Sequence, residues 1–362
     1  MAHMLDNTGG VHHMGSVKTP WHGLGHRVDP NASPEEWRRK CIPWEVYKVP
    51  TLTKSMGSDG RFIDQSNEGM FNLIRGDNGK ALSAVSDRYH VHTIESLMQI
   101  MKRLCELHDF QMETIGSLDG GKKVWALAKI AENYQLIDEE VAPYVLLSTS
   151  YDKSTQTPAR LTEVCVVCNN TLQWAEKSRP DLSISHKKEL NPTEFVDSLA
   201  VIKSDHIAFK DLASNLVETT LSGWKISELI IKVASNGKEN AVNDYARMSE
   251  DYHREQLDPS EAATFRAVTR VKNQLIAAMA NSNGHDLKAR DMTPWGVIQG
   301  VTNVVDFQSK VLLPKSTREN LVTSIEIETK ERNNRLSKSW FGTGQSLKET
   351  AVREATKYLK AA

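Results

Sequence analysis

The stretch QMETIGSLDGGKKVWALAKI, residues 111–130, decides the fold class of this chain. Its two halves are strand-like, and they flank Asp119-Gly120-Gly121, a strong β-hairpin signal. Two further strand-like runs follow, YVLLSTSY at 144–151 and ARLTEVCVVC at 159–168, separated by a polar segment. Together these runs predict an antiparallel meander of three or four strands.

Helical patterns flank this meander. Residues 93–110, TIESLMQIMKRLCELHDF, place apolar side chains at the i, i+3, i+4, i+7 spacing of an amphipathic helix. After the meander, NNTLQWAEKSR at 169–179 is expected to start a second helix. The order of helix, meander and helix predicts an α+β region.

The N-terminal part adds one helix and several strands. SPEEWRRKC, residues 33–41, combines a capping Ser33, a Pro at the first helical position and Glu36 of a capping box. The runs 44–55, 71–75 and 81–86 read as strands, with the turn-rich GDNGK between the last two. The first 16 residues read as a flexible arm.

From about residue 191 the pattern becomes helical. Asn191-Pro192-Thr193-Glu194 and Asp258-Pro259-Ser260-Glu261 each supply a cap, a Pro at the first helical position and a Glu three residues on. TPWGVIQGVTNVV and the C-terminal SLKETAVREATKYLKAA are further helix candidates. We therefore expect a flexible arm at 1–16, an α+β meander domain at 17–190 and a mainly α-helical region at 191–362.

Composition narrows the class of protein. Hydrophobic residues make up 39% and charged residues 25% of 362 residues, as in ordinary globular proteins, and the formal net charge of −1 gives no global basic field. No apolar run is long enough for a membrane span, and the N-terminus lacks the apolar core of a secretory signal. Four cysteines favour a reducing cytoplasm over a disulfide framework.

The pair Cys165 and Cys168 has C-x-x-C spacing, which raises three interpretations: a metal site, a redox pair or two buried structural cysteines. Residues three apart on a strand face opposite sides, so the structural interpretation is favoured. Asn169 and Asn170 follow directly. They are good helix caps, and at an exposed helix N-terminus they could also contact an anion or a nucleic acid.

Catalytic and metal patterns are weak. Five histidines lie early in the chain, among them His22 and His26, but no carboxylate or cysteine stands at supporting spacing. No Ser-His-Asp order or paired-carboxylate motif is present to begin a catalytic assignment. We therefore expect no metal and no cofactor, and a binding protein rather than an enzyme.

Basic and aromatic residues in and around the meander point to nucleic acid. Proteins that bind single strands combine a basic track with aromatic platforms on which bases stack. The candidate phosphate contacts and stacking residues, together with the two asparagines, are Arg88, Tyr89, Lys122, Lys123, Tyr151, Lys153, Arg160, Asn169 and Asn170. Trp125 lies in an apolar strand and is expected in the core.

Several ordered motifs resemble those of a known family. They are MAHMLDN near the start, TPWHGLG (19–25), LSAVSDRYHV (82–91), GSLDGGKKVWALAKI (116–130), YVLLSTSYDKS (144–154), VVCNNTL (166–172), TPWGVIQGVTNVVDF (293–307) and SWFGTGQSLKETA (339–351). Through them the chain resembles, over nearly its whole length, phage/plasmid-like proteins with the large domain of unknown function 932. That family usually has an Arg at Cys165 and a His at Phe307. The resemblance implies a phage, plasmid or prophage setting but no established reaction.

The predicted meander and helix also look like the β-β-β-α core of phage single-strand annealing proteins, which is a fold-level analogy. It suggests an oligomeric protein, a ring or filament, that binds single-stranded DNA and promotes annealing in recombination. One alternative is a metal-dependent nuclease or phosphotransferase that uses His22, His26 and Asp152. Another is an interaction protein that counters a host factor through its helical half.

Overall fold

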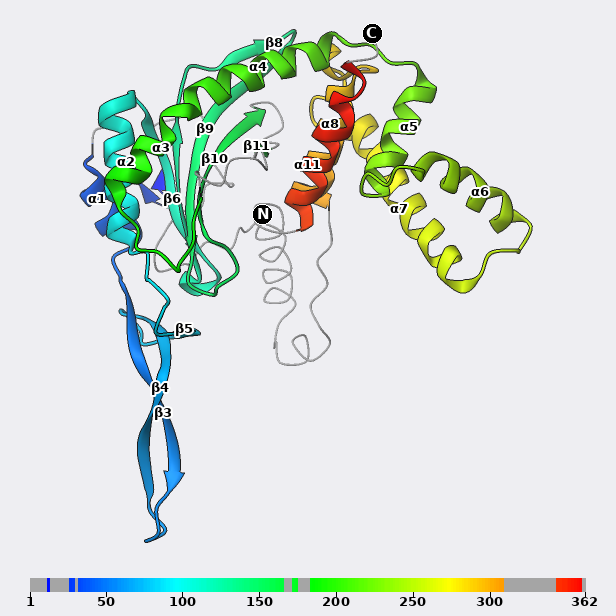
Figure 1. The fold of residues 1–362 in the computed structure, drawn as a ribbon. Helices are drawn as coiled ribbons and strands as arrows, with labels where there is room; N and C mark the ends of the chain where they lie inside the picture. The colour runs from blue at the N-terminus through cyan, green and yellow to red at the C-terminus, as the bar shows by residue number, and fades with distance from the viewer. Residues whose placement is uncertain are drawn as a thin grey trace.

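The computed structural model describes residues 12–13, 26–29, 32–165, 171–174, 183–308 and 343–359. The fold is α+β, as predicted: antiparallel sheets dominate the first half, and the elements from residue 192 onward are helical. Figure 1 shows the large sheet, a long two-stranded arm on one side of it and a group of helices on the other.

The large sheet is built on the predicted meander. Strands β6 (Gln111–Leu118), β7 (Lys123–Lys129), β9 (Glu139–Ser150) and β10 (Thr157–Cys165) lie side by side in that order, each antiparallel to the next. Asp119 and Gly120 turn the β6–β7 hairpin with positive φ angles of 54° and 68°. The short strands β1 (His12–His13), β2 (His26–Arg27), β8 (Tyr134–Leu136) and β12 (Ser183–Ile184) extend the sheet.

Residues 171–174 form a strand, and our prediction of a helix starting at 169–179 is wrong for them. Strand β11, Thr171–Trp174, pairs antiparallel with β10, and Leu161 lies opposite Trp174. Thr and Trp favour strands, and β10 offers a free edge that closes a hairpin. Tertiary pairing therefore overrides the capping signal of the asparagines.

Helices α1 (Pro34–Cys41) and α2 (Ile94–His108) form where the sequence predicts them. Ser33 accepts a hydrogen bond from the Glu36 N–H (3.2 Å), and Thr93 caps α2 through the Ser96 N–H (3.1 Å). Helix α2 packs against β6, β7 and β9 with its apolar side, including the buried Leu97, and Trp125 of β7 is fully buried as expected.

A second sheet holds β3 (Val46–Met56), β4 (Phe62–Arg75) and β5 (Ala81–Ser86) in the order β3-β4-β5. Strand β5 covers only the base of the hairpin, because it pairs with Met70–Ile74 of β4. The rest of β3 and β4 projects from the molecule as an arm (Figure 1). The strands β3, β4 and β5 and the helix α2 follow one another in β-β-β-α order.

The helical half begins at the predicted cap Asn191, which accepts from the Thr193 N–H at 3.0 Å. The helix predicted there is divided into α3 (Pro192–Ser198), a 3₁₀ turn at Leu199–Val201 and α4 (Ile202–Glu218). The remaining helices are α5 (Gly223–Ala234), α6 (Ala241–His253), α7 (Pro259–Asn281), α8 (Pro294–Asn303), the π-helical turn η6 (Val304–Gln308) and α11 (Thr343–Thr356).

One hydrophobic cluster joins the two halves. It contains Leu147 and Leu161 of the sheet together with Phe209 of α4 and Trp295 of α8. The proposed boundary near residue 190 therefore separates two types of structure that share a core, and the three-part division stays a prediction. Among the described helices, none has the length and apolar character that crossing a membrane requires.

Candidate nucleic-acid interface

The most promising surface lies on α7. Asp258 caps this helix by accepting hydrogen bonds from the backbone N–H groups of Ser260 (2.8 Å) and Glu261 (3.0 Å), and Pro259 occupies the first helical position. Phe265, Val268, Leu275 and Ala278 are buried at helical spacing. The opposite side of the helix faces solvent along its whole length.

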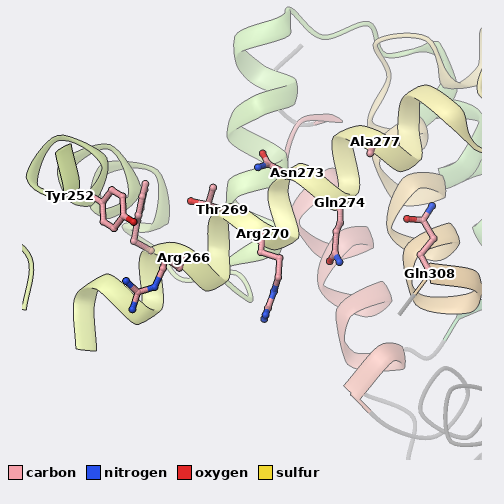
Figure 2. A pocket seen from close by; sticks show the side chains of 9 residues that line it. Tyr252, Arg266, Thr269, Arg270, Asn273, Gln274, Ala277 and Gln308 are labelled. Carbon is pink, nitrogen blue, oxygen red and sulfur yellow. The ribbon is translucent and has the colours of Figure 1, made fainter. Parts of the chain in front are cut away.

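This exposed side of α7 lines a shallow groove of about 590 Å³. Arg270 and Gln274 project from α7 on one side of the groove, and Gln308 of the π-helical turn lies across the groove from them (Figure 2). Tyr252 of α6 closes the other end; it is 39% exposed and packs against Phe265 with ring centroids 5.0 Å apart. The groove is lined by Tyr252, Phe265, Arg266, Thr269, Arg270, Asn273, Gln274, Ala277 and Gln308.

The groove, which we call the α7 groove, is cationic. No acidic residue occurs between Ala262 and Asn281 in the sequence. Glu261, which directly precedes this stretch, and Asp251 of α6 are bound by Arg247 at 2.7 and 3.1 Å, which reduces their field at the groove. Within the described chain neither Arg266 nor Arg270 makes an ion pair. Both guanidinium groups are therefore available to an anionic ligand.

Three basic residues that the sequence singled out, the exposed Arg88 and Lys153 and the half-buried Lys122, lie at one end of the large sheet. Arg88 follows β5, Lys122 precedes β7, and Lys153 occupies the turn between β9 and β10. Acidic residues are interleaved with them: Lys122 Nζ lies 3.3 Å from Asp119 Oδ2. This interleaving makes the sheet end less cationic than the α7 groove.

The aromatic and buried members of the predicted set have structural partners. Tyr151 is fully buried, and its hydroxyl donates to the His92 carbonyl at 2.9 Å, so its ring has no face open to a base. Tyr89 is half-buried and donates to the Ser150 carbonyl at 3.0 Å. Lys123 is buried, and desolvation lowers its pKa although the carboxylates of Asp152 and Asp119 oppose that shift.

The other members of the set lie elsewhere. Arg160 is half-buried on β10, where desolvation lowers its pKa and nearby Glu349 of α11 acts in the opposite direction. Asn169 and Asn170, Cys168 and the side chain of Cys165 lie outside the described residues. The structure thus brings Arg88, Lys122 and Lys153 to one end of the sheet, with Arg160 apart from them.

The rings of Tyr89, His186 and His92 form a stack next to this end of the large sheet. The His186 ring stacks on Tyr89 at 4.6 Å and on His92 at 4.2 Å between centroids. His92 contacts the Thr157 hydroxyl through Nδ1 (2.7 Å) and the Lys188 carbonyl through Nε2 (2.9 Å). Because the carbonyl can only accept, Nε2 carries the proton and Nδ1 accepts from Thr157. Burial lowers the pKa of His92 to about 4.

This pKa shift predicts acid sensitivity of folding. The unfolded state binds a proton at His92 near pH 6.5, whereas the folded state resists it until about pH 4. Neutral His92 therefore contributes about 1–3 kcal/mol to the free energy of unfolding above pH 6.5. This contribution is lost as the pH falls toward 4. Urea unfolding between these pH values should show a smaller pH dependence in His92→Gln.

A buried ion pair joins the sheet to the helical half. Glu139, the first residue of β9, accepts from Arg290 Nη2 (2.5 Å) and Nε (3.1 Å), and the Trp295 indole N–H donates to it at 2.9 Å. Glu139 is fully buried, and the Arg290 side chain is 5% exposed. Asp138 accepts from the backbone N–H groups of Lys288 (2.8 Å) and Ala289. This joint fixes the start of α8 against the sheet.

The alternative metal site finds no support in the described residues. His22 and the side chain of His26 lie outside them, and Asp152 is half-buried beside Lys123. No group of three or more metal-ligating side chains converges anywhere in the described part of the chain.

Sequence reasoning missed the α7 groove and the Glu139–Arg290 joint. A local signal existed for the first: Arg266 and Arg270 stand one turn apart in a helical stretch without acids. No local signal existed for the second, because its partners are separated by 151 positions.

Fold and surface define an α+β protein with a shared core and a cationic groove on one exposed helix. The chain belongs to the family described as Domain of unknown function (DUF932), whose model matches residues 81–340. That match spans β5, the meander and the helices through α8. No curated protein and no solved structure matches the chain significantly.

Proposed function

We propose that this protein binds single-stranded DNA and promotes strand annealing in recombination, in the cytoplasm of a cell that hosts a phage or another mobile element. The observation that supports binding is the α7 groove, with Arg266 and Arg270 free of ion pairs within the described chain and no acid among its lining residues. The annealing part of the proposal extends the fold-level analogy made for the meander, where strand β11 stands in place of the expected helix.

The lining of the groove suits a single strand. Guanidinium groups bind phosphates with paired hydrogen bonds, and the amides of Asn273 and Gln274 can donate to and accept from base edges. The half-exposed ring of Tyr252 at the end of the groove offers a face on which a base can stack. The basic residues at the sheet end, Arg88, Lys122 and Lys153, become secondary contacts in this proposal.

The test is binding of a labelled oligonucleotide, followed by fluorescence anisotropy over a range of salt concentrations. Wild-type affinity should fall steeply with salt, and Arg266→Glu/Arg270→Glu should weaken it at least about tenfold. If both arginines contact phosphates, the slope of log affinity against log salt should decrease by about 1.4, since each single-strand contact contributes about 0.7.

The matched control is Arg39→Glu/Arg103→Glu, which makes the same charge change on α1 and α2 (Figure 1). It should bind like wild type. Equal losses in both variants would show a general charge effect and not a site. A wild-type protein that binds no DNA, or that fails to speed pairing of complementary labelled strands, would contradict the binding or the annealing part of the proposal, respectively.

A further inference from the structure

The distal part of the β3–β4 arm has no partner within the described chain. In residues 52–66 no side chain is buried, and two strands alone are marginally stable in water. Strand β3 is an edge along its length, and β4 is unpaired by β5 beyond Met70. A 14-residue strand such as β4 reaches about 45 Å at the usual rise per residue.

One face of the distal arm carries three exposed apolar side chains around a central pair of opposite charges. The register places Leu52 opposite Ser66, Lys54 opposite Asp64 and Met56 opposite Phe62. Directly paired residues share a face, and positions two apart on a strand return to it. Leu52, Met56 and Phe62 therefore lie on the same face, and they are 59%, 68% and 66% exposed. Large apolar side chains gathered in this way mark an interaction surface.

Side-chain contacts anchor the base of the arm, so its solvent-exposed end is held in a defined position. Arg75 is 1% exposed, stacks over the Trp44 ring at 4.3 Å and binds Asp77 through Nε (2.7 Å) and Nη2 (2.8 Å). Lys48 Nζ donates to the backbone carbonyls of Asp87 (2.6 Å) and Tyr89 (3.0 Å).

We propose that this face binds the same face of a second copy of the chain. Lys54 and Asp64 stand side by side in its centre, and in the described chain neither makes an ion pair. A two-fold axis parallel to the strands, midway between Lys54 and Asp64, brings Lys54 of each copy against Asp64 of the other. The same axis packs Met56 against Phe62 and Leu52 against Ser66. This self-complementarity is what a symmetric dimer interface requires.

Charge argues against nucleic acid as the occupant. Residues 52–66 carry Lys54 and Arg61 against Asp59 and Asp64, so the distal arm is electrically balanced. A phosphate backbone needs an uncompensated basic track, which the α7 groove has and the arm lacks. The two proposals therefore rest on different residues and can fail separately.

The test is sedimentation of the full chain over a wide concentration range. Wild type should form dimers or larger species. Phe62→Glu should weaken association by about 100-fold or more, because a symmetric interface loses the same apolar side chain twice. Lys54→Glu should weaken it too, and Lys54→Glu/Asp64→Lys should restore it. A double variant as weak as the single one would overturn the two-fold register.

Thr53→Glu is the control, since Thr53 lies on the opposite face of the same arm. It should associate like wild type, and so should Arg266→Glu/Arg270→Glu. Melting temperatures check that every variant is folded, because Thr53→Glu also removes the contact of the Thr53 hydroxyl with the Asn67 amide. A monomeric wild type, an unaffected Phe62→Glu protein, or equal disruption by Thr53→Glu would overturn the proposal. Loss of DNA binding in Phe62→Glu with self-association intact would assign the face to nucleic acid instead.

Discussion

Glu139→Ala is expected to lower the free energy of unfolding by about 3–5 kcal/mol, the usual cost of breaking a buried ion pair by removing one partner. The carboxylate is fully buried and binds Arg290 through two hydrogen bonds and Trp295 through a third. Its removal leaves a guanidinium and an indole N–H in a site with little access to water. Chemical denaturation monitored by tryptophan fluorescence measures the loss.

Glu140→Ala is the matched control for this change. Glu140 is the next residue on β9, half-buried, and binds Asn133 Nδ2 at 2.7 Å near the surface. Surface substitutions of this kind usually change stability by less than about 0.5 kcal/mol. If Glu139→Ala and Glu140→Ala proved equally mild, the joint would not stabilise the fold as the geometry indicates.

Parts of this fold were predictable because their causes are local. The Asp119-Gly120-Gly121 turn and the alternation around it predict the meander, and the caps at Ser33, Asn191 and Asp258 mark real helix starts. In each case a side chain within three residues satisfies backbone N–H groups, so a short window of sequence contains the whole interaction.

Other parts depend on partners far along the chain. The residues 169–179 have a helix-like start, but the free edge of β10 decides in favour of strand β11. The outer part of β4, FIDQSNEGM, has no apolar alternation, because the arm packs on no core that would impose one. Its strand state comes from pairing with β3.

The basic and aromatic residues predicted as a site and the α7 groove are separate surfaces. A basic surface with an aromatic neighbour was expected on the meander, where the structure instead buries Tyr151 and sets Lys122 beside Asp119. Ionic partners across a fold cannot be read from composition. The helix α7 differs because its 20 residues from Ala262 contain no acid at all, a property visible in the sequence.

Gly296→Ala is expected to be as damaging as the loss of Glu139, for a steric reason at the same joint. Gly296 lies in the first turn of α8, where its N–H donates to the capping Thr293 hydroxyl at 3.1 Å. A methyl group there would overlap the carbonyl oxygen of Arg290, and that carbonyl's carbon would lie 2.9 Å away. Backbone atoms can relieve such an overlap only by shifting the 3₁₀ turn at Lys288–Arg290, which the ion pair holds in place.

Helix propensity alone would make Gly296→Ala stabilising by about 1 kcal/mol, so a measured loss of stability is due to the steric clash. We expect a net loss of about 3 kcal/mol, at the upper end for overpacking. Gly300→Ala, one turn later in α8, is the control. Its methyl group would meet Met279 Cγ at 2.6 Å, part of a flexible side chain that can move, so its change should stay within about 1 kcal/mol.

The two substitutions at the joint should also be coupled. Once Glu139→Ala has released Arg290, the turn can move away from the new methyl group. The double variant should therefore lose less stability than the sum of the single variants, by about 0.5–3 kcal/mol as for other contacting residues. If the two losses of stability were strictly additive, the Glu139 carboxylate and the close approach of Gly296 would act on different elements. That result would contradict our interpretation, because both residues contact Arg290.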